Sequence, residues 1–450
     1  MKIHGKKISI IGAEKSGLSA AKLVKKFGGI PFVTDFNARE KLSKQIELLE
    51  DEKIAYEYGT HSAKVFHCDF IITSPGVPTN SRVLAKAFTK NIKVISELEF
   101  ASLFCKGKII SITGTNGKTT TTSLCAHTLN HCGVKTYAAG NIGLPLSEIV
   151  SDVKENECVA LETSSFQLDY MDKFKPFISM ILNLTPDHLD RYEDDFEKYV
   201  KSKVAVTKNQ DANDYFISNE DDFNTSINVH NEKVNRFGFS LNKELPNGSY
   251  MKDGGLFFTR DGVKTEICKV SDMSLKGEHN IANTLAVLSA AKILNLPDEK
   301  IKESFGNFPG VEHRLEFVRE VNGIKFINDS KATNVDSVWY ALKSFDEPII
   351  LILGGKDKGN NYDQIRDLVK KHVKKIYAIG VSASKVYNYF KDYVPVVKKS
   401  TLDDCVVSGR TDAAPNEIVL LSPACASFDM FDNYEHRGRV FKNAVMGLTE

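Results

Sequence analysis

The clearest chemical signal lies in residues 108–122, which read KIISITGTNGKTTTT. An apolar run leads into two glycines, a lysine and four threonines. Glycines let backbone N–H groups surround phosphate oxygens, and the N-terminus of a following helix adds its positive dipole end. The lysine of such a loop reaches the β- and γ-phosphates of a nucleotide, and the hydroxyl beside it ligates Mg²⁺. The sequence therefore predicts a phosphate-binding loop formed by Gly114, Thr115, Asn116, Gly117, Lys118, Thr119 and Thr120.

This loop is tighter than the common phosphate loop. The usual spacing, GxxxxGK[ST], would place a glycine at position 112, where this chain has Ile112, so the first glycine is Gly114. The alternative is a glycine-rich turn with a solvated lysine, which the strand–loop–helix context disfavours. Switches, motors, kinases and ligases all use such loops, so the rest of the chain must distinguish them.

Two more side chains with metal-binding chemistry follow predicted strands. Glu162 ends the strand in CVALETSS, and His188 follows the strand in ILNLTPDHLD. Ligands of open α/β sheets gather beyond the carboxyl ends of the strands, and Mg²⁺ prefers oxygen ligands. Glu162 is therefore the expected partner of Thr119 at a metal site. His188 is open to a structural as well as a functional interpretation, because a lone histidine is often structural.

A lysine on an apolar helix face is the next candidate. In the helix expected from about 194 to 208, Phe196, Tyr199, Val200 and Lys203 fall on one face. One interpretation is a lysine whose stem is buried and whose charge reaches water. The other is a buried lysine at a functional site.

The N-terminal stretch resembles a dinucleotide fingerprint. GAEKSG at 12–17 follows a strand and opens a helix, and Asp35 ends the next strand, where a ribose ligand is expected. Glu14 replaces the middle glycine and hinders close approach of a pyrophosphate. A nicotinamide cofactor is therefore disfavoured, and a different nucleotide is the alternative.

Three polar loops follow strands in the last third of the chain. They read NDSKATN at 328–334, GGKDKG at 354–359 and SPACASFD at 422–429. Charged loops are usually only solvated. Because these three would meet at one edge of a sheet and hold lysines and hydroxyls, they predict a site for a substrate with carboxylates.

The elements that must position these groups form an α/β protein. Strands alternate with helices along all 450 residues, which predicts mostly parallel sheets covered by helices. We expect a Rossmann-like domain at 1–97, a central phosphate-loop ATPase domain at 98–308 and a Rossmann-like domain at 309–450. Within the central block, the polar, glycine-rich sequence at about 210–272 indicates hairpins.

Composition excludes some classes of function. The formal net charge is +1, from 59 basic and 58 acidic residues, so no global field attracts nucleic acid. No apolar run is long enough for membrane insertion, and the start of the chain lacks a secretory signal. The eight cysteines are scattered and without CxxC pairs, as expected of buried thiols in a cytoplasmic protein.

Seven motifs together resemble the Mur ligase family. In order along the chain they are GTNGKTTT, ETSSFQL, NLTPDHLDRY, GEHNIAN, HRLEF, NDSKATN and LSPACASFD. The resemblance covers all three blocks and implies a UDP-substrate-binding, an ATP-binding and an amino-acid-binding domain. NDSKATN and SPACASFD resemble the branch of the family that adds D-glutamate. It implies an ATP-dependent amide ligase that joins D-glutamate to UDP-N-acetylmuramoyl-L-alanine through an acyl phosphate, in cytoplasmic peptidoglycan precursor synthesis.

The resemblance also implies roles for individual residues. ATP and Mg²⁺, with two ions expected, would be bound by the phosphate loop together with Glu162, His188 and a carbamate on Lys203. Further nucleotide contacts are implied at Asn280, Asn283, Arg314 and Asp329. Substrate contacts are implied at Asp35, Ser74, Asn141, Lys331, Thr333, Lys358, Ser427 and Tyr434. Tyr434 stands where phenylalanine is expected, and FN follows Asp35 in place of a TR-like pair. A monomer is expected.

Three other functions compete with this interpretation. A sister ligase would add L-lysine, diaminopimelate or glutamate to another acceptor. The loops of the last domain discriminate between such a ligase and one that adds D-glutamate. A phosphate-loop switch would need no third domain with carboxylate-binding loops. A nicotinamide dehydrogenase is disfavoured by Glu14 and by the second nucleotide loop.

Overall fold

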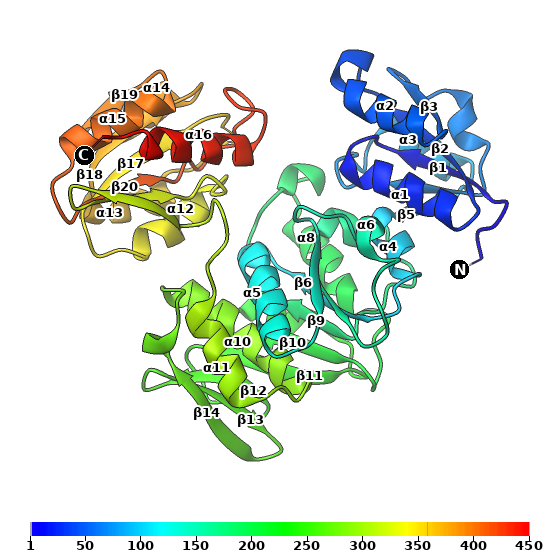
Figure 1. Ribbon diagram of the computed structural model, residues 1–450, viewed down its shortest axis with the longest axis horizontal. Coiled ribbons are helices and arrows are strands. Elements are labelled where there is room, and N and C mark those ends of the chain that lie inside the picture. Colours follow the sequence, from blue (N-terminus) through cyan, green and yellow to red (C-terminus); the bar gives the residue numbers. More distant parts are fainter. Residues whose placement is uncertain (1, 358, 450) are drawn as a thin grey trace. The chain divides into compact units, whose positions relative to one another are not determined.

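The computed structural model describes residues 2–357 and 359–449. These residues form two compact units, one of Met1–Ser274 with Asn280–Phe308 and one of Leu275–His279 with Pro309–Glu450. The first unit holds two sheets and the second holds one (Figure 1). Among the described residues, no helix is both long enough and apolar enough to cross a bilayer.

The first sheet has five parallel strands in the order β3-β2-β1-β4-β5. This order matches the first five strands of the Rossmann arrangement, 3-2-1-4-5-6. The strands are β1 (Lys7–Ile11), β2 (Ile30–Asp35), β3 (Ala55–Tyr58), β4 (Phe70–Thr73) and β5 (Val94–Ser96), and the main helices are α1 (Lys15–Lys26), α2 (Ser43–Asp51), α3 (Arg82–Thr89) and α4 (Glu97–Ser102). Strand β1 is an almost continuous apolar run because both of its faces are covered.

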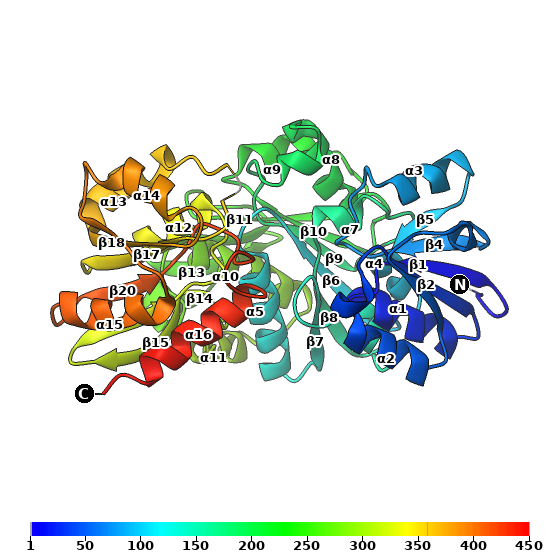
Figure 2. The same ribbon diagram turned by 90° about the horizontal axis from the view of Figure 1, so that it is seen from above.

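The second sheet has nine strands in the order β14-β13-β12-β11-β10-β9-β6-β8-β7. Its central strand β6 (Lys108–Thr113) pairs in parallel with β8 (Cys158–Glu162) and β9 (Ile178–Ile181). The other strands are β7 (Thr136–Gly140), β10 (Tyr215–Asn219), β11 (Asn235–Ser240), β12 (Gly248–Lys252), β13 (Gly255–Arg260) and β14 (Val263–Lys269). The helices are α5 (Lys118–His131), α6 (Leu146–Ile149), α7 (Ser165–Leu168), α8 (Phe196–Val204), α9 (Phe223–Asn228), α10 (Glu278–Ile293) and α11 (Asp298–Asn307). As Figure 2 shows, α8 and α9 lie side by side, and β10 connects them along the chain.

The hairpins predicted over residues 210–272 form only in the second half of that segment. Strands β10 and β11 are parallel and are joined through α9, whereas β12, β13 and β14 pair antiparallel. A parallel connection needs a crossover, which α9 supplies. The polar character of the segment concealed this crossover helix.

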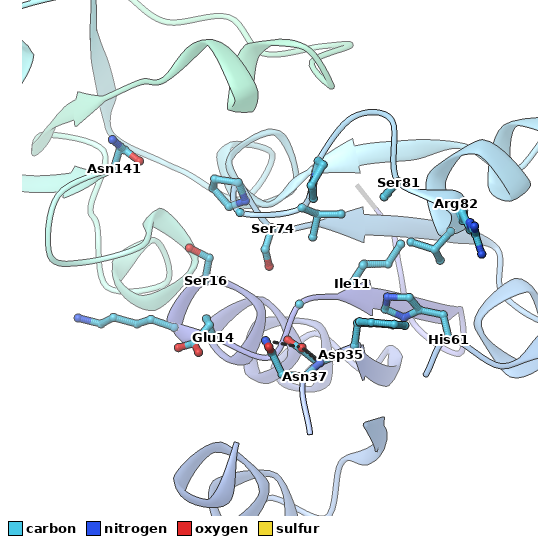
Figure 3. Close-up of a pocket in the computed structure, with 18 residues that line it drawn as sticks. Ile11, Glu14, Ser16, Asp35, Asn37, His61, Ser74, Ser81, Arg82 and Asn141 are labelled. Carbon is cyan, nitrogen blue, oxygen red and sulfur yellow. Dashed lines mark hydrogen bonds between the residues drawn. The ribbon is translucent and has the colours of Figure 1, made fainter. Parts of the chain in front are cut away.

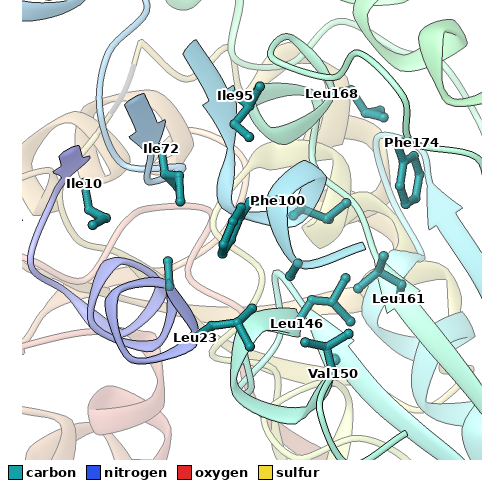
Figure 4. Packing of buried hydrophobic residues seen from close by; sticks show 14 of the residues in the cluster. Ile10, Leu23, Ile72, Ile95, Phe100, Leu146, Val150, Leu161, Leu168 and Phe174 are labelled. Atoms are coloured by element: carbon teal, nitrogen blue, oxygen red, sulfur yellow. The ribbon is translucent and has the colours of Figure 1, made fainter. Parts of the chain in front are cut away.

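The first two sheets share one hydrophobic core. Figure 4 shows Leu23 of α1 close to Leu146 of α6, and the same buried cluster also contains Ile10 of β1 and Leu161 of β8. Phe100 of α4 belongs to the same buried cluster and is fully buried. Burying one large apolar side chain contributes about 1.5–3 kcal/mol. This shared core explains why both sheets belong to one unit.

The third sheet has six strands in the order β15-β16-β20-β17-β18-β19. The antiparallel edge strand β15 (Glu316–Val321) pairs with β16 (Ile324–Asn328), and the remaining pairs are parallel. The other strands are β17 (Ile349–Gly354), β18 (Val373–Ile379), β19 (Val396–Lys398) and β20 (Ile418–Leu421), and the helices are α12 (Val335–Lys343), α13 (Asp363–His372), α14 (Ala383–Phe390), α15 (Leu402–Asp412) and α16 (Tyr434–Met446). The mostly parallel α/β architecture agrees with the predicted fold class.

Candidate active site

The predicted phosphate loop joins strand β6 to helix α5. Gly114 and Gly117 have φ values of +144° and +85°, which favour glycine. A Cβ at Gly117 would lie 2.5 Å from Asn283 Oδ1, and one at Gly114 would lie 3.1 Å from Leu182 Cβ. Both glycines are therefore required by backbone conformation and by close neighbours. The N-terminus of α5, which begins at Lys118, faces this loop.

Two lysines meet at the loop. Lys118 Nζ donates hydrogen bonds to the carbonyl oxygens of Gly114 at 2.9 Å and Thr115 at 2.7 Å. Lys203 Nζ reaches the same Gly114 oxygen at 2.8 Å from helix α8. Lys203 is only 2% exposed, so the buried alternative of the sequence analysis is the one observed. Burial, followed by repulsion from Lys118, holds the pKa of Lys203 well below its usual value.

A pair of buried oxygens lies beside the loop. Thr119 Oγ1 donates to Glu162 Oε2 at 2.7 Å, and the other carboxylate oxygen of Glu162 accepts from Asn141 Nδ2 at 3.1 Å. Glu162 ends β8 and Asn141 follows β7, and these two strands are neighbours in the sheet. The parallel sheet thus brings together three residues that are far apart in the sequence.

His188 lies on a backbone segment in a sparsely populated conformation. Its φ is +54°, and Glu193 and Asp194 in the same segment also have positive φ. The imidazole is exposed, with Nε2 at 3.7 Å from Asp187 Oδ2. The ring of Phe166 packs edge-on against it at a centroid distance of 5.2 Å.

Asn183 is a structural residue of the site that sequence reasoning missed. Its side-chain oxygen accepts from Asn116 N at 2.8 Å, its amide nitrogen donates to Asn116 O at 3.1 Å, and its backbone oxygen accepts from Thr115 N at 2.9 Å. Asn183 therefore clamps the phosphate loop from the end of β9. Its place after a strand in the same motif as His188 was the available signal.

A cavity of about 770 Å³ opens at the carboxyl ends of the first sheet. Ligand pockets of this size accept drug-sized molecules. Figure 3 shows Ser16 and Ser74 on either side of this space, and Asn141 approaching from the second sheet. Ser74 Oγ is buried and, among the described residues, has no hydrogen-bond partner, so it can form a hydrogen bond with a polar ligand atom. Asn141 is thus shared by this cavity and by the carboxylate beside the phosphate loop.

Asp35 lines the cavity, but its carboxylate already has several partners. Oδ2 accepts from Ala13 N at 2.7 Å, and Oδ1 accepts from the backbone and side-chain nitrogens of Asn37 at 2.8 and 3.0 Å. Figure 3 shows the contacts with Asn37. Asp35 therefore fixes the turn after β2 and presents Asn37 to the cavity. Phe36, the other unexpected residue, is 74% exposed at the same wall.

Asn280 and Asn283 lie on α10 close to the phosphate loop. Both are buried, and Asn283 Nδ2 lies 3.5 Å from Asn280 Oδ1. Asn283 faces Gly117, whose missing side chain leaves room for it. These contacts make Asn283 part of the loop's surroundings within the first unit.

In the second unit, the three polar loops meet at the carboxyl ends of neighbouring strands. Strands β16, β20 and β17 are adjacent, and they end at the loops 328–334, 422–429 and 354–359. Lys356 and Ala426 exchange backbone hydrogen bonds at 2.9 and 3.2 Å. The sheet therefore groups the described residues of the three loops, as their positions after strands predicted.

Arg437 of α16 ties two of these loops together and was not predicted. Its guanidinium donates to Ser330 Oγ at 2.9 Å, to Ser330 O at 2.7 Å and to Cys425 O at 3.0 Å. The side chain is only 2% exposed. Because a C-terminal helix arginine carries no local motif, only the tertiary structure reveals this role.

Asp329 is buried within the same loops. Ser422 Oγ donates to Oδ2 at 2.8 Å and Leu315 N to Oδ1 at 3.2 Å. Burial raises the pKa of Asp329 to about 7, although the positive charge of Arg314 opposes the shift. Among the described residues, Arg314 Nε is buried without a hydrogen-bond partner.

The remaining predicted contacts lie on or near these loops. Lys331 Nζ lies over the ring of Tyr434 at 5.3 Å. Thr333 is half-buried on the first loop, and Ser427 is 2% exposed on the third. Lys358 lies outside the described residues. Lys331, Thr333, Ser427 and Tyr434 all belong to the second unit.

The donor set beside the phosphate loop fits Mg²⁺. The hydroxyl of Thr119 and the carboxylate of Glu162 are hard oxygen ligands, already 2.7 Å apart and both buried. The ammonium of Lys203 does not fit a cation site, whereas a carbamate on that nitrogen would supply oxygen ligands. The residues present are therefore compatible with the metal if Lys203 is modified.

Three family models match consecutive parts of the chain. The model of the Mur ligase MurD-like N-terminal domain matches residues 6–96, that of the Mur ligase middle domain 112–291, and that of the Mur ligase glutamate ligase domain 313–425. The chain belongs to the Mur ligase family. The resemblance noted in the sequence is thereby confirmed.

Relatives within the Mur ligase family match over the full length. A protein from Chloroherpeton thalassium is 42% identical, over 99% of this chain and 99% of its own length. A protein from Acidobacterium capsulatum is also 42% identical, over 99% and 97%. Both carry the name UDP-N-acetylmuramoylalanine–D-glutamate ligase.

Solved Mur ligase structures share the fold. UDP-N-acetylmuramate-alanine ligase MurC from Thermotoga maritima is 18% identical and matches 98% of this chain and 99% of its own with a TM-score of 0.61. MurF ligase from the same organism, in complex with ADP, is 13% identical and matches 92% and 95% with a TM-score of 0.58. At these identities the comparison shows the common three-domain α/β architecture of Mur ligases.

Proposed function

We propose that this Mur ligase joins D-glutamate to UDP-N-acetylmuramoyl-L-alanine at the expense of ATP, as a step of peptidoglycan precursor synthesis. The names of the relatives from Chloroherpeton thalassium and Acidobacterium capsulatum support the choice of substrates. The cytoplasm is the compartment in which we expect the reaction.

The observation that carries the proposal is the position of Asn141. Its side chain lines the cavity of the first sheet and donates to Glu162, which accepts from Thr119 of the phosphate loop. A nucleotide-sugar acceptor held in the cavity would therefore extend its carboxylate end toward the loop that holds the nucleotide. A nucleotide switch has no need of such a second ligand.

The proposed reaction has two steps. A carboxylate oxygen of the acceptor attacks the γ-phosphorus of ATP, so an acyl phosphate forms as the bond to ADP breaks. The amino group of D-glutamate then attacks the acyl carbon, phosphate leaves, and a proton is released from the new amide nitrogen. A carboxylate oxygen is a poor leaving group. Phosphorylation converts it into part of a phosphate, which leaves readily.

The residues of the phosphate loop provide electrostatic stabilisation. Charge on the transferring phosphoryl group is stabilised by cations and by fixed N–H dipoles. Lys118 supplies the cation, and the amides of the loop and the N-terminus of α5 supply the dipoles. Bound Mg²⁺, held by Thr119, Glu162, His188 and a carbamate on Lys203, would neutralise phosphate charge.

The neutral form of Lys203 makes its carbamate chemically reasonable. Burial, followed by repulsion from Lys118, lowers its pKa, and this favours the neutral amine, whose free electron pair can attack CO₂. The new N–C bond gives a carbamic acid, and loss of a proton leaves an anion with two oxygens. A misplaced cation thereby becomes a ligand of the kind that Mg²⁺ prefers.

The loops of the second unit are proposed to choose the amino acid. Lys358 and Thr333 would bind the two carboxylates of D-glutamate, with Ser427, Lys331 and Tyr434 beside them. A lysine ammonium attracts a carboxylate and repels the ammonium of a lysine substrate. Asn280, Asn283, Arg314 and Asp329 are proposed to contact the nucleotide.

A direct test supplies the protein with ATP, Mg²⁺, UDP-N-acetylmuramoyl-L-alanine and a panel of amino acids, and follows the product by mass. We expect a product with D-glutamate that requires all components. Nucleotide hydrolysis that ignores the acceptor would favour a switch, and a product with L-lysine or diaminopimelate would favour a sister ligase.

A further inference from the structure

Arg191 bridges the cavity of the first sheet and the segment that carries His188. Its NH1 donates to Pro75 O at 3.1 Å, and its NH2 donates to Gly76 O at 3.4 Å. Pro75 and Gly76 line the cavity, next to the buried Ser74 hydroxyl. The guanidinium is thus attached to a wall of the acceptor site through backbone atoms.

The same guanidinium also reaches His188 through one aromatic ring. The Arg191 Cζ lies 4.0 Å from the centroid of the Phe166 ring, which packs edge-on against His188 at 5.2 Å. The ring of Phe166 therefore has the guanidinium on its face and the imidazole at 5.2 Å. A cation over an aromatic face is attracted to the ring, and this attraction helps to orient the ring.

The backbone ties Arg191 to His188 as well. Arg191 N donates to His188 O at 3.0 Å, which closes the short 3-10 turn Leu189–Arg191. His188 holds a left-handed conformation with φ of +54°, and such a conformation persists only when its surroundings enforce it. A shift of Arg191 would therefore alter the direction of the imidazole.

We propose that Arg191 is a positioning residue that couples occupancy of the cavity to the placement of His188. A ligand that fills the cavity displaces the turn of residues 74–77. Because Arg191 is hydrogen-bonded to this turn, it moves with it and shifts the ring of Phe166 and the imidazole of His188. Acceptor and Mg²⁺–nucleotide consequently bind cooperatively. This inference rests on the proposed function, because it takes the acceptor as the occupant of the cavity.

Binding measurements test the coupling without turnover. The affinity of UDP-N-acetylmuramoyl-L-alanine is measured by calorimetry, with and without a non-hydrolysable ATP analogue and Mg²⁺, and the reverse titration is also made. Coupling between two ligands is reciprocal and typically amounts to about 5–150-fold. We expect wild-type protein to show such a factor in both directions and Arg191→Ala to reduce it to about 2-fold or less.

Two further variants separate coupling from general damage. Arg236 resembles Arg191, since it lies 5.6 Å from the ring of Phe216 and donates to Val229 O at 3.4 Å, but it lines neither site. Arg236→Ala should keep the wild-type coupling factor. Arg191→Lys keeps the charge near Phe166 but cannot contact both carbonyls in the same way, so it should retain an intermediate factor even if the alanine variant fails to fold.

The outcomes distinguish the inference from the function on which it rests. Wild-type coupling that persists in Arg191→Ala or in Arg191→Lys at full strength overturns the role of Arg191. Binding of both ligands to the wild type without coupling also overturns it. Failure of the wild type to bind the acceptor at all contradicts the proposed function instead.

Discussion

Lys118 and Lys203 donate hydrogen bonds to the same acceptor, the carbonyl oxygen of Gly114, at 2.9 and 2.8 Å. Burial, followed by repulsion from Lys118, lowers the pKa of Lys203. The chain thereby distinguishes two chemically identical side chains. Lys118 is the proposed cation for phosphate, and the lowered pKa of Lys203 favours its neutral amine.

Lys118→Ala should reduce turnover by on the order of 10²-fold or more, because one preorganised electrostatic contact to the transition state commonly has that value. Steady-state release of phosphate in the presence of all substrates measures the effect. Lys106→Ala, which removes an exposed lysine just before β6, is the control and should retain wild-type turnover. Near-normal ligation by Lys118→Ala would exclude the assigned role.

Lys203→Arg should be nearly inactive, since arginine keeps a positive charge and cannot form a carbamate. Lys203→Ala leaves a gap that acetate or another short carboxylate should fill, with partial recovery of activity. Lys201→Ala on the exposed side of the same helix is the matched control. An active arginine variant would return Lys203 to a structural role.

The carbamate itself can be observed without an assay of activity. Protein equilibrated with ¹³C-labelled CO₂ should give a carbamate signal in the ¹³C NMR spectrum that disappears in Lys203→Ala and persists in Lys201→Ala. The lowered pKa of Lys203 is the reason to expect modification at this position among the lysines. A signal that survives in Lys203→Ala would assign the carbamate to another lysine.

Lys358→Ala should raise the apparent KM for D-glutamate far more than that for ATP. The reason is that the proposed partner of Lys358 is a carboxylate of the amino acid, not the nucleotide. Lys391→Ala, which removes an exposed lysine after α14, serves as the control. An equal effect on both KM values would assign Lys358 a different role.

Asp329 should make the stability of the second unit depend on pH. Its folded-state pKa of about 7 lies above the ordinary value of 3.8, so the folded carboxyl keeps its proton where the unfolded one has lost it. The free energy of unfolding should therefore fall as pH rises from about 4 to 7, by at most about 4 kcal/mol. Above pH 7 this contribution should stay constant.

Asp329→Asn should flatten that pH dependence, because asparagine does not titrate. Chemical denaturation at several pH values, followed by the fluorescence of the single tryptophan Trp339 on α12, reports on the second unit. Asp363→Asn alters an exposed carboxyl of the same unit and should leave the slope unchanged. The interpretation fails if the slope between pH 4 and 7 is the same in Asp329→Asn and in the wild type.

The two units should change their arrangement when ligands bind. The reacting amine and acyl phosphate must come within roughly 3–3.5 Å, although the phosphate loop and the loops proposed to bind the amino acid belong to different units. The segment Phe308–Val311, which includes the boundary at Phe308, is the expected hinge. Small-angle scattering profiles should differ with and without an ATP analogue and acceptor, and identical profiles would speak against closure.

The sequence predicted the site best where a short local motif determines the backbone conformation. The phosphate loop needs glycines at fixed positions, and both Gly114 and Gly117 adopt the positive φ that this requires. Strand ends were equally informative, because a parallel sheet brings Glu162 to Thr119 whatever the intervening sequence. The periodicity of one helix placed Lys203 on an apolar face, and the structure shows the buried one of the two alternatives.

Contacts between distant segments were beyond the reach of the same reasoning. Arg437 and Ser330 meet only because α16 packs on the third sheet, and no local sequence pattern near either residue predicts their hydrogen bond. The hydrogen bond from Ala13 N to Asp35 is also tertiary, whereas the contact between Asp35 and Asn37 is local to the turn after β2. Such contacts depend on the packing of whole elements.

The core that joins the first two sheets limits how this protein can be rearranged by recombination. A fragment that ends near residue 97 would leave Ile10, Leu23 and Ile95 beside solvent, and we expect it to aggregate. Chimeras between homologues should tolerate a junction near Phe308 and fail when the junction is placed between the first two sheets. A change of acceptor specificity by domain exchange therefore requires that both sheets be replaced together.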